Sequence, residues 1–395
     1  MGKPKAKGKT KQRARRRREV AAARDASEPV GDLPRLDTLK DVPSFADLKS
    51  DERQRAAFRS YVEEAAASDP VSAEELRMGF VVRLDRGFPL VATEGATFRA
   101  EHAVAFAKTR GEEERLLPAV GDAVAVRVPD GHDMGVIECV LPRRTSFARW
   151  RGKNRGERQV LAANVDTIFI VQPLGADRSD APMIDRIARS LVLVNDCGAE
   201  PVVVFTKSDR VGSAEVERLR GEAARVVGEG IRIIATSAAT GSGLDEVRAS
   251  IPAGSCAMIL GESGAGKSTL LNALLGHEAL ETGGVRERDD MGRHTTVARV
   301  MVALPAPFGV VADAPGLRSL PLVGHERGLA RTFPAIVEAS RSCRFRDCTH
   351  THEPGCALRE AVTDGSVDEA ALDAFLALAD EMRVSAQSLD PDVQV

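Results

Sequence analysis

The chain has 395 residues, of which 43% are hydrophobic and 29% are charged, and its formal net charge is −3. This composition is ordinary for a globular protein, and the length allows two or three domains with separate cores. No run of 18 apolar residues occurs, and no apolar segment follows the basic N-terminus, so neither a transmembrane helix nor a secretory signal is expected. We therefore expect a cytoplasmic protein.

Residues 1–18 form a basic tail, with five lysines, five arginines and no acidic residue between Lys3 and Arg18. Such a block repels itself and buries nothing, so we expect it to be disordered. Ten cations on one segment match a phosphate backbone and would release counterions on binding it. A solubilising or cloning-derived tail is the alternative interpretation.

Residues 19–77 form an extension that is rich in Ala, Glu and Asp and carries no chemical motif. One helix is predicted over Ser44–Ala67, with Ser44 as its cap and Asp47 at the third helical position. The extension is therefore expected to be partly helical.

Residues 78–142 change to short apolar or alternating runs that are separated by glycine-containing turns. The five expected strands are Gly79–Leu84, Phe88–Thr93, Thr97–Ala107, Ala123–Val128 and Met134–Leu141. Five short strands predict a small β-barrel, and the OB-fold is one such barrel. The segment has few aromatic residues, so base stacking would contribute little to any RNA binding.

Residues 143–325 alternate strands with helices from Val165 onward. The expected strands are Thr167–Val171, Pro201–Phe205, Ile231–Ala235, Ala257–Leu260 and Gly309–Ala312, and the expected helices are Pro182–Asn195, Ser213–Val227 and one starting at Lys267. Continuous apolar strands that alternate with helices predict a mostly parallel sheet covered on both faces. Residues 326–395 are expected to be helical around a Cys/His cluster, with a last amphipathic helix at Ala370–Arg383.

A glycine-rich segment fits the phosphate-loop pattern G-x-x-x-x-G-K-[ST] in full, between an apolar strand and a helix, as the motif requires. The backbone N–H groups of such a loop and the dipole of the following helix face a bound phosphate. Lys267 is expected to reach the β- and γ-phosphates and to act in catalysis, while Ser268 would hold Mg²⁺. The residues predicted to bind the nucleotide here are Gly261, Glu262, Ser263, Gly264, Ala265, Gly266, Lys267, Ser268 and Thr269.

Two segments downstream have the pattern of nucleotide switches. Asp313 ends an apolar strand and would orient Mg²⁺, usually through water, and the N–H of Gly316 would meet the γ-phosphate. In the polar loop before that strand, Thr296 is favoured to bind Mg²⁺ with its hydroxyl and the γ-phosphate with its N–H, which would make the loop a nucleotide sensor. Thr295 is the competing residue for this role.

Two short motifs predict a guanine base site. Thr206, Lys207 and Asp209 form T-K-x-D after a strand, and the Asp209 carboxylate can accept two hydrogen bonds from guanine that adenine does not offer. Lys207 would lie along the purine face, and the N–H of Ala238, next to Ser237, would meet guanine O6. Thr206 stands where asparagine is usual, and the shorter side chain is expected to lose bracing contacts and to lower nucleotide affinity. The two motifs together favour GTP over ATP.

A cysteine and histidine cluster, Cys343-x4-Cys348-x-His350-x5-Cys356, offers three thiolates and one imidazole. This set suits one tetrahedral, structural Zn²⁺ ion. His352 is the rival fourth ligand. The arginines around the cluster are expected to be either a solvated face or a phosphate-contacting patch; they are Arg341, Arg344, Arg346 and Arg359.

The order of the motifs is unusual, because the base motifs precede the phosphate loop, the switch and D-x-x-G, whereas GTPases usually begin with the phosphate loop. Chain termini often lie close together, so circular permutation can preserve such a site. This order closely resembles that of the RsgA (YjeQ) family of circularly permuted GTPases, over residues 79–385. Further marks of the resemblance are Arg143-Arg144-Thr145, the run Q-V-L-A-A-N-V-D at 159–166 and the cysteine spacing.

The resemblance implies an OB-type barrel, a permuted GTPase core and a helical zinc-binding domain. It also implies GTP/GDP, Mg²⁺ and one structural Zn²⁺ as ligands, with the small ribosomal subunit and its rRNA as partners. The family acts late in small-subunit assembly, and the subunit stimulates its GTPase activity. We expect a monomer and no membrane partner. The alternatives are an ATP-using enzyme, an RNA-binding factor gated by nucleotide with negligible catalysis, or a GTPase of a non-ribosomal RNA process.

Catalysis is expected to need help, because the position that holds the water-orienting glutamine in Ras-like enzymes is Leu317. Leucine cannot align water, so the intrinsic rate should be at or below about 10⁻⁴ to 10⁻³ s⁻¹. His294 on the switch is the first candidate for the missing group, and the family resemblance points the same way. Ordinary loop packing is the alternative role for His294.

Overall fold

The computed structural model describes residues 36–69, 73–85, 88–103, 117–128, 134–151, 157–175, 181–228, 230–279, 299–313 and 320–389. Met1–Leu39 and Lys40–Val395 are separate units, and the described part of the first contains the 3-10 turn η2 (Leu36–Thr38). The following predictions lie outside the described residues: the basic tail, His294, Thr295, Thr296, Gly316 and Leu317. In the described parts of the chain, none of the helices is long and apolar enough to cross a bilayer.

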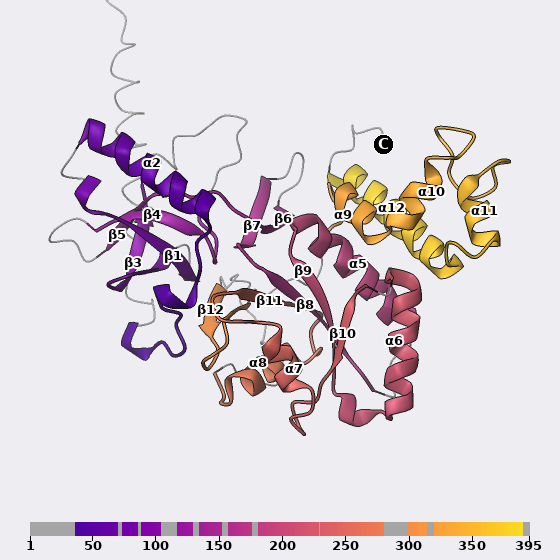
Figure 1. Ribbon diagram of the computed structural model, residues 1–395, viewed down its shortest axis with the longest axis horizontal. Helices are drawn as coiled ribbons and strands as arrows, with labels where there is room; N and C mark the ends of the chain where they lie inside the picture. The colour runs from indigo at the N-terminus through magenta and orange to yellow at the C-terminus, as the bar shows by residue number, and fades with distance from the viewer. Residues whose placement is uncertain are drawn as a thin grey trace, which may run out of the picture. The chain divides into compact units, whose positions relative to one another are not determined.

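A five-stranded barrel follows the N-terminal segment (Figure 1). Its strands are β1 (Leu76–Asp85), β2 (Phe88–Thr93), β3 (Thr97–His102), β4 (Ala123–Arg127) and β5 (Gly135–Val140). They follow the order β1-β2-β3-β5-β4, and pairing of β1 with β4 closes the barrel. Only β3 and β5 run parallel among these pairs. The inward side chains, among them Val81, Val91 and Ile137, are fully buried, and the structure confirms the predicted barrel.

The predicted parallel sheet is also present, with the order β10-β9-β8-β11-β13-β12. Its strands are β8 (Thr167–Pro173), β9 (Glu200–Thr206), β10 (Arg232–Ala235), β11 (Cys256–Leu260), β12 (Arg299–Ala303) and β13 (Val310–Asp313). All neighbours pair in parallel except β12 and β13. A mixed α/β fold that includes a five-stranded barrel therefore agrees with the sequence-based expectation.

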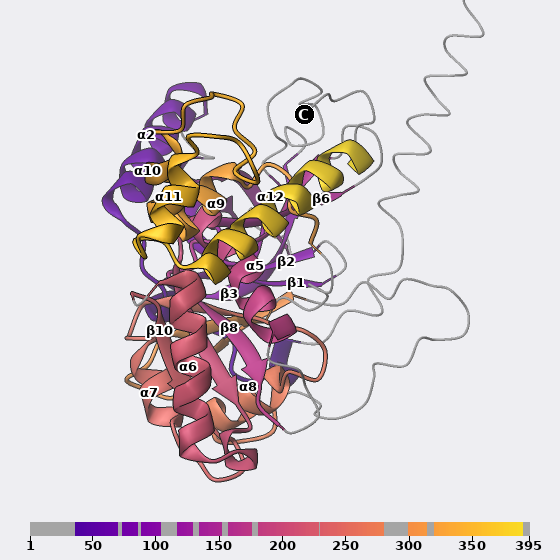
Figure 2. The same ribbon diagram turned by 90° about the vertical axis from the view of Figure 1, so that its right-hand side faces the viewer.

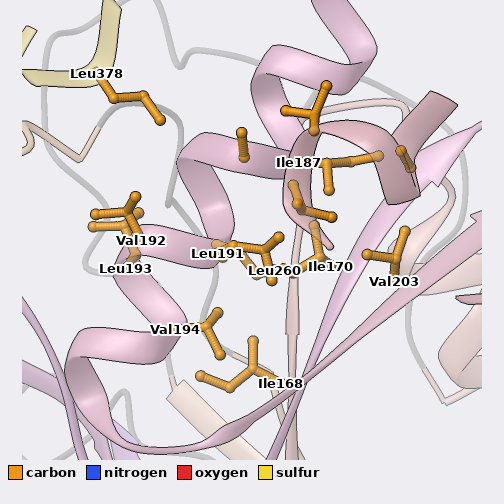
Figure 3. Close-up of a cluster of buried hydrophobic side chains, with 14 of the residues drawn as sticks. Ile168, Ile170, Ile187, Leu191, Val192, Leu193, Val194, Val203, Leu260 and Leu378 are labelled. Carbon is orange, nitrogen blue, oxygen red and sulfur yellow. The ribbon is translucent and has the colours of Figure 1, made fainter. Parts of the chain in front are cut away.

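Helices cover both faces of this sheet. On one face, Ile168 and Ile170 of β8 pack with Ile187 and Leu191 of α5 (Ala181–Cys197), as Figure 3 shows. The same cluster includes residues of α6 (Ser213–Val227). On the other face, the alternate residues of β8, Phe169 and Val171, pack with α7 (Leu244–Ala249) and α8 (Lys267–Leu275). Burial on both faces explains why the strands are continuously apolar.

Three strands and the short helix α7 were missing from the sequence-based prediction. The strands β6 (Ser146–Arg151) and β7 (Glu157–Ala163) form a separate antiparallel hairpin. Its sequence is rich in arginine and glycine, so the alternation of apolar and polar residues that indicates a strand is not recognisable there. The other missing strand is β12, which joins the sheet to the barrel through antiparallel pairing of Val300 with Arg83.

The predicted helix over Ser44–Ala67 is wrong at its start. Ser44 and Asp47 do form a capping box, but it closes only a single turn, η3 (Phe45–Asp47). Leu48 is extended and bridges to Gly254, which interrupts the helix. The helix α2 (Glu52–Ser68) then begins at a second capping box, formed by Asp51 and Gln54.

The C-terminal part is helical, as predicted, and rests on α5 (Figure 2). Its helices are α9 (Glu326–Thr332), α10 (Pro334–Ser340), α11 (Ala357–Thr363) and α12 (Glu369–Leu389). A Cβ atom at Gly328 of α9 would lie 2.1 Å from the carbonyl oxygen of Val192, so the two backbones require glycine there. Arg189 of α5 binds both carboxylate oxygens of Glu381 at 2.8 and 3.1 Å, which ties α12 to the same helix.

Candidate functional site

The phosphate loop lies between two buried elements, β11 and α8. Every residue of β11 is buried, and so are Leu270, Leu271 and Leu274 of α8, so the core fixes both ends of the loop. Gly266 has φ +92°, a left-handed conformation that side chains rarely adopt. A Cβ atom at Gly261 would lie 2.7 Å from the carbonyl oxygen of Val171. The backbone conformation of the loop therefore requires glycine at both positions.

Lys267, the first residue of α8, folds back over this loop. Its Nζ donates to the carbonyl oxygens of Gly261 at 2.8 Å and Glu262 at 2.7 Å, so the ammonium is directed towards the loop. Ser268 follows Lys267 on the half-buried start of the helix. Lys267 and Ser268 are thus the first two residues of a helix, and the backbone N–H groups of a helix N-terminus stabilise an anion.

The strand order places the other motifs at the same edge of the sheet. From β8 the chain proceeds to β9 and β10 on one side, and from β11 it proceeds to β12 and β13 on the other. Ligands of open α/β sheets bind beyond the carboxyl ends of the strands at such a reversal. Asp313 ends β13, beside β11, with Ala312 in register with Met258. The predicted Mg²⁺ carboxylate and the phosphate loop therefore follow adjacent parallel strands.

The base motif is joined directly to the phosphate loop. The buried Thr206 hydroxyl donates to the carbonyl oxygen of Ala265 at 2.7 Å, and Lys207 Nζ donates to that of Gly264 at 3.1 Å. The short Thr206 side chain thus makes a connecting hydrogen bond of its own, and the expected loss of other bracing contacts and of nucleotide affinity stays a prediction.

The second base motif meets the first through a hydrogen bond between side chains. Strands β9 and β10 are parallel with Phe205 opposite Ala235, so the loops that follow them are neighbours. Ser237 Oγ donates to Asp209 Oδ1 at 2.5 Å. This bond lowers the pKa of the Asp209 carboxyl below its usual value, which keeps the group ionised as a hydrogen-bond acceptor. Ala238 follows Ser237 in the same loop.

The four predicted zinc ligands converge. One ligand atom from each of Cys343, Cys348, His350 and Cys356 lies within 4.8 Å of all the others. His350 Nδ1 is 3.6 Å from the sulfur atoms of Cys343 and Cys356, and these sulfurs are 4.0 Å apart. Ligands around a tetrahedral Zn²⁺ ion are about 3.3 to 3.8 Å apart, so the distances among Cys343, His350 and Cys356 are close to those that this ion requires. The rival ligand His352 does not belong to the group, and its Nδ1 pairs with the Thr351 hydroxyl.

Glu353 holds the loop that carries His350, and sequence reasoning did not find it. Its carboxylate accepts hydrogen bonds from the backbone N–H groups of Thr349, Thr351 and His352 at 2.9 to 3.2 Å. The hydroxyl of Thr349 also donates to it, and these bonds together keep the pKa of Glu353 far below its usual value. The residue is three positions after His350, but nothing in the sequence marks it as a loop organiser.

The residues that marked the family resemblance lie at the junction between barrel and sheet. Arg143 binds the fully buried Asp122 carboxylate with two hydrogen bonds of 2.7 Å. Asn164 donates to the carbonyl oxygen of Gly121 and accepts from the N–H of Arg144, both at 2.9 Å. Arg143, Arg144 and Asn164 thus have a structural role: their hydrogen bonds hold the chain in place just before β8, the first strand of the parallel sheet.

The phosphate loop, Asp313 and the base motifs follow strands at one edge of a mostly parallel sheet, and the base motifs come first in the chain. This arrangement is that of a circularly permuted P-loop GTPase. The RsgA GTPase family model matches residues 140–323. The small ribosomal subunit biogenesis GTPase RsgA of Streptomyces coelicolor is 40% identical over 311 residues, which cover 79% of this chain and 82% of the relative. The RsgA of Opitutus terrae is 41% identical, with coverages of 70% and 75%. The chain therefore belongs to the RsgA GTPase family, and it is a GTP hydrolase.

Solved structures show the same fold. YjeQ from Thermotoga maritima superposes with a TM-score of 0.58 and 26% identity, covering 78% of this chain and 99% of that one. YloQ, described as a circularly permuted GTPase, superposes with a TM-score of 0.54 and 22% identity, with coverages of 81% and 97%.

Proposed function

We propose that this GTPase binds the small ribosomal subunit and its rRNA, and couples GTP hydrolysis to a late step of subunit assembly. The observation that supports this most is the identity of about 40% over most of the chain to relatives named for small-subunit biogenesis. The basic tail, with ten cations and no acid, suits an RNA backbone as partner. We further propose a monomer that acts in the cytoplasm.

The nucleotide site is proposed to consist of the phosphate loop at 261–269, Asp313, Gly316 and the base motifs. Mg²⁺, when bound, would neutralise charge on the β- and γ-phosphates. Ser268, Thr296 and Asp313 are its proposed ligands, with Thr295 as the alternative to Thr296. The link from Thr206 to the loop supports this assignment, because it sets the distance between base and phosphate contacts.

Catalysis is proposed to rely on Lys267 for charge stabilisation and on His294 to orient the attacking water, because Leu317 has no polar group. The replacement His294→Ala tests this assignment. It should lower subunit-stimulated turnover by about 10² or more while GTP affinity stays unchanged. Stimulated turnover that survives intact would contradict the role.

The Cys/His cluster is proposed to bind one structural Zn²⁺ through Cys343, Cys348, His350 and Cys356. Four protein ligands leave no open coordination position, so the ion would stabilise the segment between α10 and α11 without a part in hydrolysis. We accordingly propose these domains: a tail (1–18), an extension (19–77), an OB-type barrel (78–142), the permuted GTPase domain (143–325) and a helical zinc-binding domain (326–395).

The experiment that tests the function is turnover of GTP and of ATP, with and without purified small ribosomal subunits. Strong stimulation by the subunit for GTP alone is the expected result. A rate of GTP turnover that is the same with and without the subunit would contradict the ribosomal assignment and favour a GTPase of another RNA process. Subunit binding that depends on GTP, without any turnover, would favour a nucleotide-gated binding factor.

A further inference from the structure

The phosphate loop carries an acidic side chain, Glu262, at its second position. The sequence of the loop, 261–269, holds no other acid and a single lysine, Lys267. The Glu262 carbonyl oxygen accepts from Lys267 Nζ at 2.7 Å, so Glu262 borders the ammonium that is proposed to face the phosphates. A carboxylate beside a site for polyphosphate repels the ligand, because both are negative. Glu262 therefore lowers nucleotide affinity unless a cation offsets its charge.

Such a cation is present, because Arg186 of α5 lies beside the Glu262 carboxylate. Arg186 Nε is 3.7 Å from Glu262 Oε2, and it donates to Gln172 Oε1 at 3.4 Å. The strand register explains this meeting. Leu260 of β11 lies opposite Ile170 of β8, so the residues that follow β11 pass beside the buried Gln172 near the end of β8. Parallel pairing of β8 and β11 thus brings the N-terminal half of α5 to the phosphate loop.

The backbone of Arg186 is fixed, whereas its guanidinium is held weakly. Ile187 and Leu191 of the same helix are fully buried in the core. The contacts of Arg186 Nε, at 3.4 and 3.7 Å, are longer than the 2.7 to 2.9 Å that is typical, roughly, of hydrogen bonds between charged groups. Because these contacts are long, the guanidinium contributes mainly through its charge and little through structural support of the loop.

We infer that Glu262 and Arg186 together set how strongly the site prefers GTP over GDP: the Glu262 carboxylate disfavours the γ-phosphate, and Arg186 offsets this repulsion. The inference rests on the proposed function, in which Lys267 and the backbone of the loop bind the β- and γ-phosphates. GTP carries about one negative charge more than GDP, so a charge beside the loop changes the affinity for GTP more than that for GDP. Both residues are thus specificity-determining residues that act through their charge.

The size of the effect follows from the exposure of the two side chains. Those of Arg186 and Glu262 are 25% and 54% exposed, so water screens both charges. Interactions between such charges change a dissociation constant by about 1.5- to fivefold. Salt weakens them further, because the Debye length is only about 8 Å at physiological ionic strength. The expected signature is thus a small effect that is larger for the triphosphate and decreases with salt.

The test uses the full-length protein with Glu262→Gln, Arg186→Gln and both replacements together, because glutamine removes the charge and keeps a polar side chain. Asp380→Asn and Arg383→Gln, which remove the charges of an exposed ion pair on α12, are the matched controls. Dissociation constants for GDP and for a non-hydrolysable GTP analogue are measured with Mg²⁺ by fluorescence, at low and at high salt. Urea unfolding checks that each variant is folded.

Glu262→Gln should tighten binding of the analogue by about two- to fivefold at low salt, and Arg186→Gln should weaken it by a similar factor. Both changes should be smaller for GDP and smaller at high salt. The double variant should bind like the parent, because the two lost charges cancel, and so should both controls. An unchanged analogue constant in Glu262→Gln would overturn the inference, as would equal changes for the two nucleotides or changes that persist at high salt. Glu262→Gln alone decides if Arg186→Gln does not fold.

The replacement Lys267→Ala separates this inference from the proposed function. If it weakens binding of both nucleotides while the variants of Glu262 and Arg186 bind like the parent, the inference fails and the proposed phosphate site stands. If Lys267→Ala leaves both dissociation constants unchanged, the proposed phosphate site fails, and the inference fails with it.

Discussion

The phosphate loop and the Cys/His segment are two sites of the same chain that are held in shape differently. The phosphate loop emerges from a fully buried strand and enters a helix whose Leu270 and Leu274 are buried in the core. The Cys/His segment lies between two short helices, and three of its four ligands are half-exposed, with Phe345 beside them 41% exposed. Apolar burial stabilises the first geometry, whereas hydrogen bonds to Glu353 and a bound ion would stabilise the second.

Because of this difference, replacements at the two sites should affect different properties: GTP turnover at the phosphate loop, and local stability at the Cys/His segment. Removing a polar group from the phosphate loop should impair the reaction and leave the fold intact, because the surrounding core is unchanged. Removing a proposed ligand from the Cys/His segment should disturb local structure, because binding of the proposed ion would be the main stabilising interaction there. Four replacements test the comparison, from the largest expected effect to the smallest.

Lys267→Ala should have the largest effect, with a loss of about 10²- to 10³-fold in GTP turnover. The variant removes the cation that is proposed to face the phosphates, while the surrounding apolar residues, such as Leu270 and Leu274, are unchanged. The free energy of unfolding should stay within about 0.5 kcal/mol of the parent, as expected for a site away from the core. Arg383→Ala, on the exposed face of α12, is the control for loss of a charge. A loss of turnover below tenfold would contradict the role of Lys267.

Cys348→Ser should weaken zinc binding by about 100-fold. Structural sites bind Zn²⁺ with about 10 to 16 kcal/mol, which is roughly 2.5 to 4 kcal/mol for each of four ligands. Competition with a chromophoric chelator measures the affinity, and hydrogen exchange should increase between α10 and α11 but not at the phosphate loop. Cys139→Ser, a free cysteine of the barrel, should retain the metal. Unchanged affinity in Cys348→Ser would exclude it as a ligand.

Glu353→Ala should weaken zinc binding by about tenfold, because a residue that orients ligands without touching the metal typically contributes this much. The change leaves the N–H groups of Thr349, Thr351 and His352 without their acceptor. Chelator competition is again the measurement, with Glu338→Ala on α10 as the control. A zinc affinity equal to that of the parent would show that the four ligands alone determine the conformation of the loop.

Thr206→Val should have the smallest effect, with GTP and GDP affinities that fall together by about fivefold. Valine has nearly the same shape but leaves the buried Ala265 carbonyl without its donor, at a cost of about 1 kcal/mol. Thr206→Ser keeps the hydroxyl and should bind like the parent. Fluorescence titration with both nucleotides measures the two affinities. A valine variant that binds both nucleotides like the parent would show that the hydrogen bond from Thr206 to Ala265 does not stabilise the nucleotide site.

The elements that the sequence predicted well have local signals. The barrel strands, the parallel strands and α12 were found because their apolar residues recur with the period of the element or in continuous runs. The β6–β7 hairpin was missed because arginines interrupt its alternation. The helix expected over 44–67 begins late because Leu48 pairs with Gly254, a contact about 200 residues away that no local pattern reveals.

By itself, the sequence determined which chemical groups this protein offers: the phosphate loop, the base motifs, their permuted order and the four cysteine and histidine side chains of the proposed zinc site are readable from residue types and spacing. Only the tertiary structure decided how the parts support one another. The pairs Thr206 with Ala265, Asp209 with Ser237 and Asp41 with His277 join loops that are distant in the chain. Such pairs depend on strand order, register and packing of the whole sheet, and neither periodicity nor spacing encodes them.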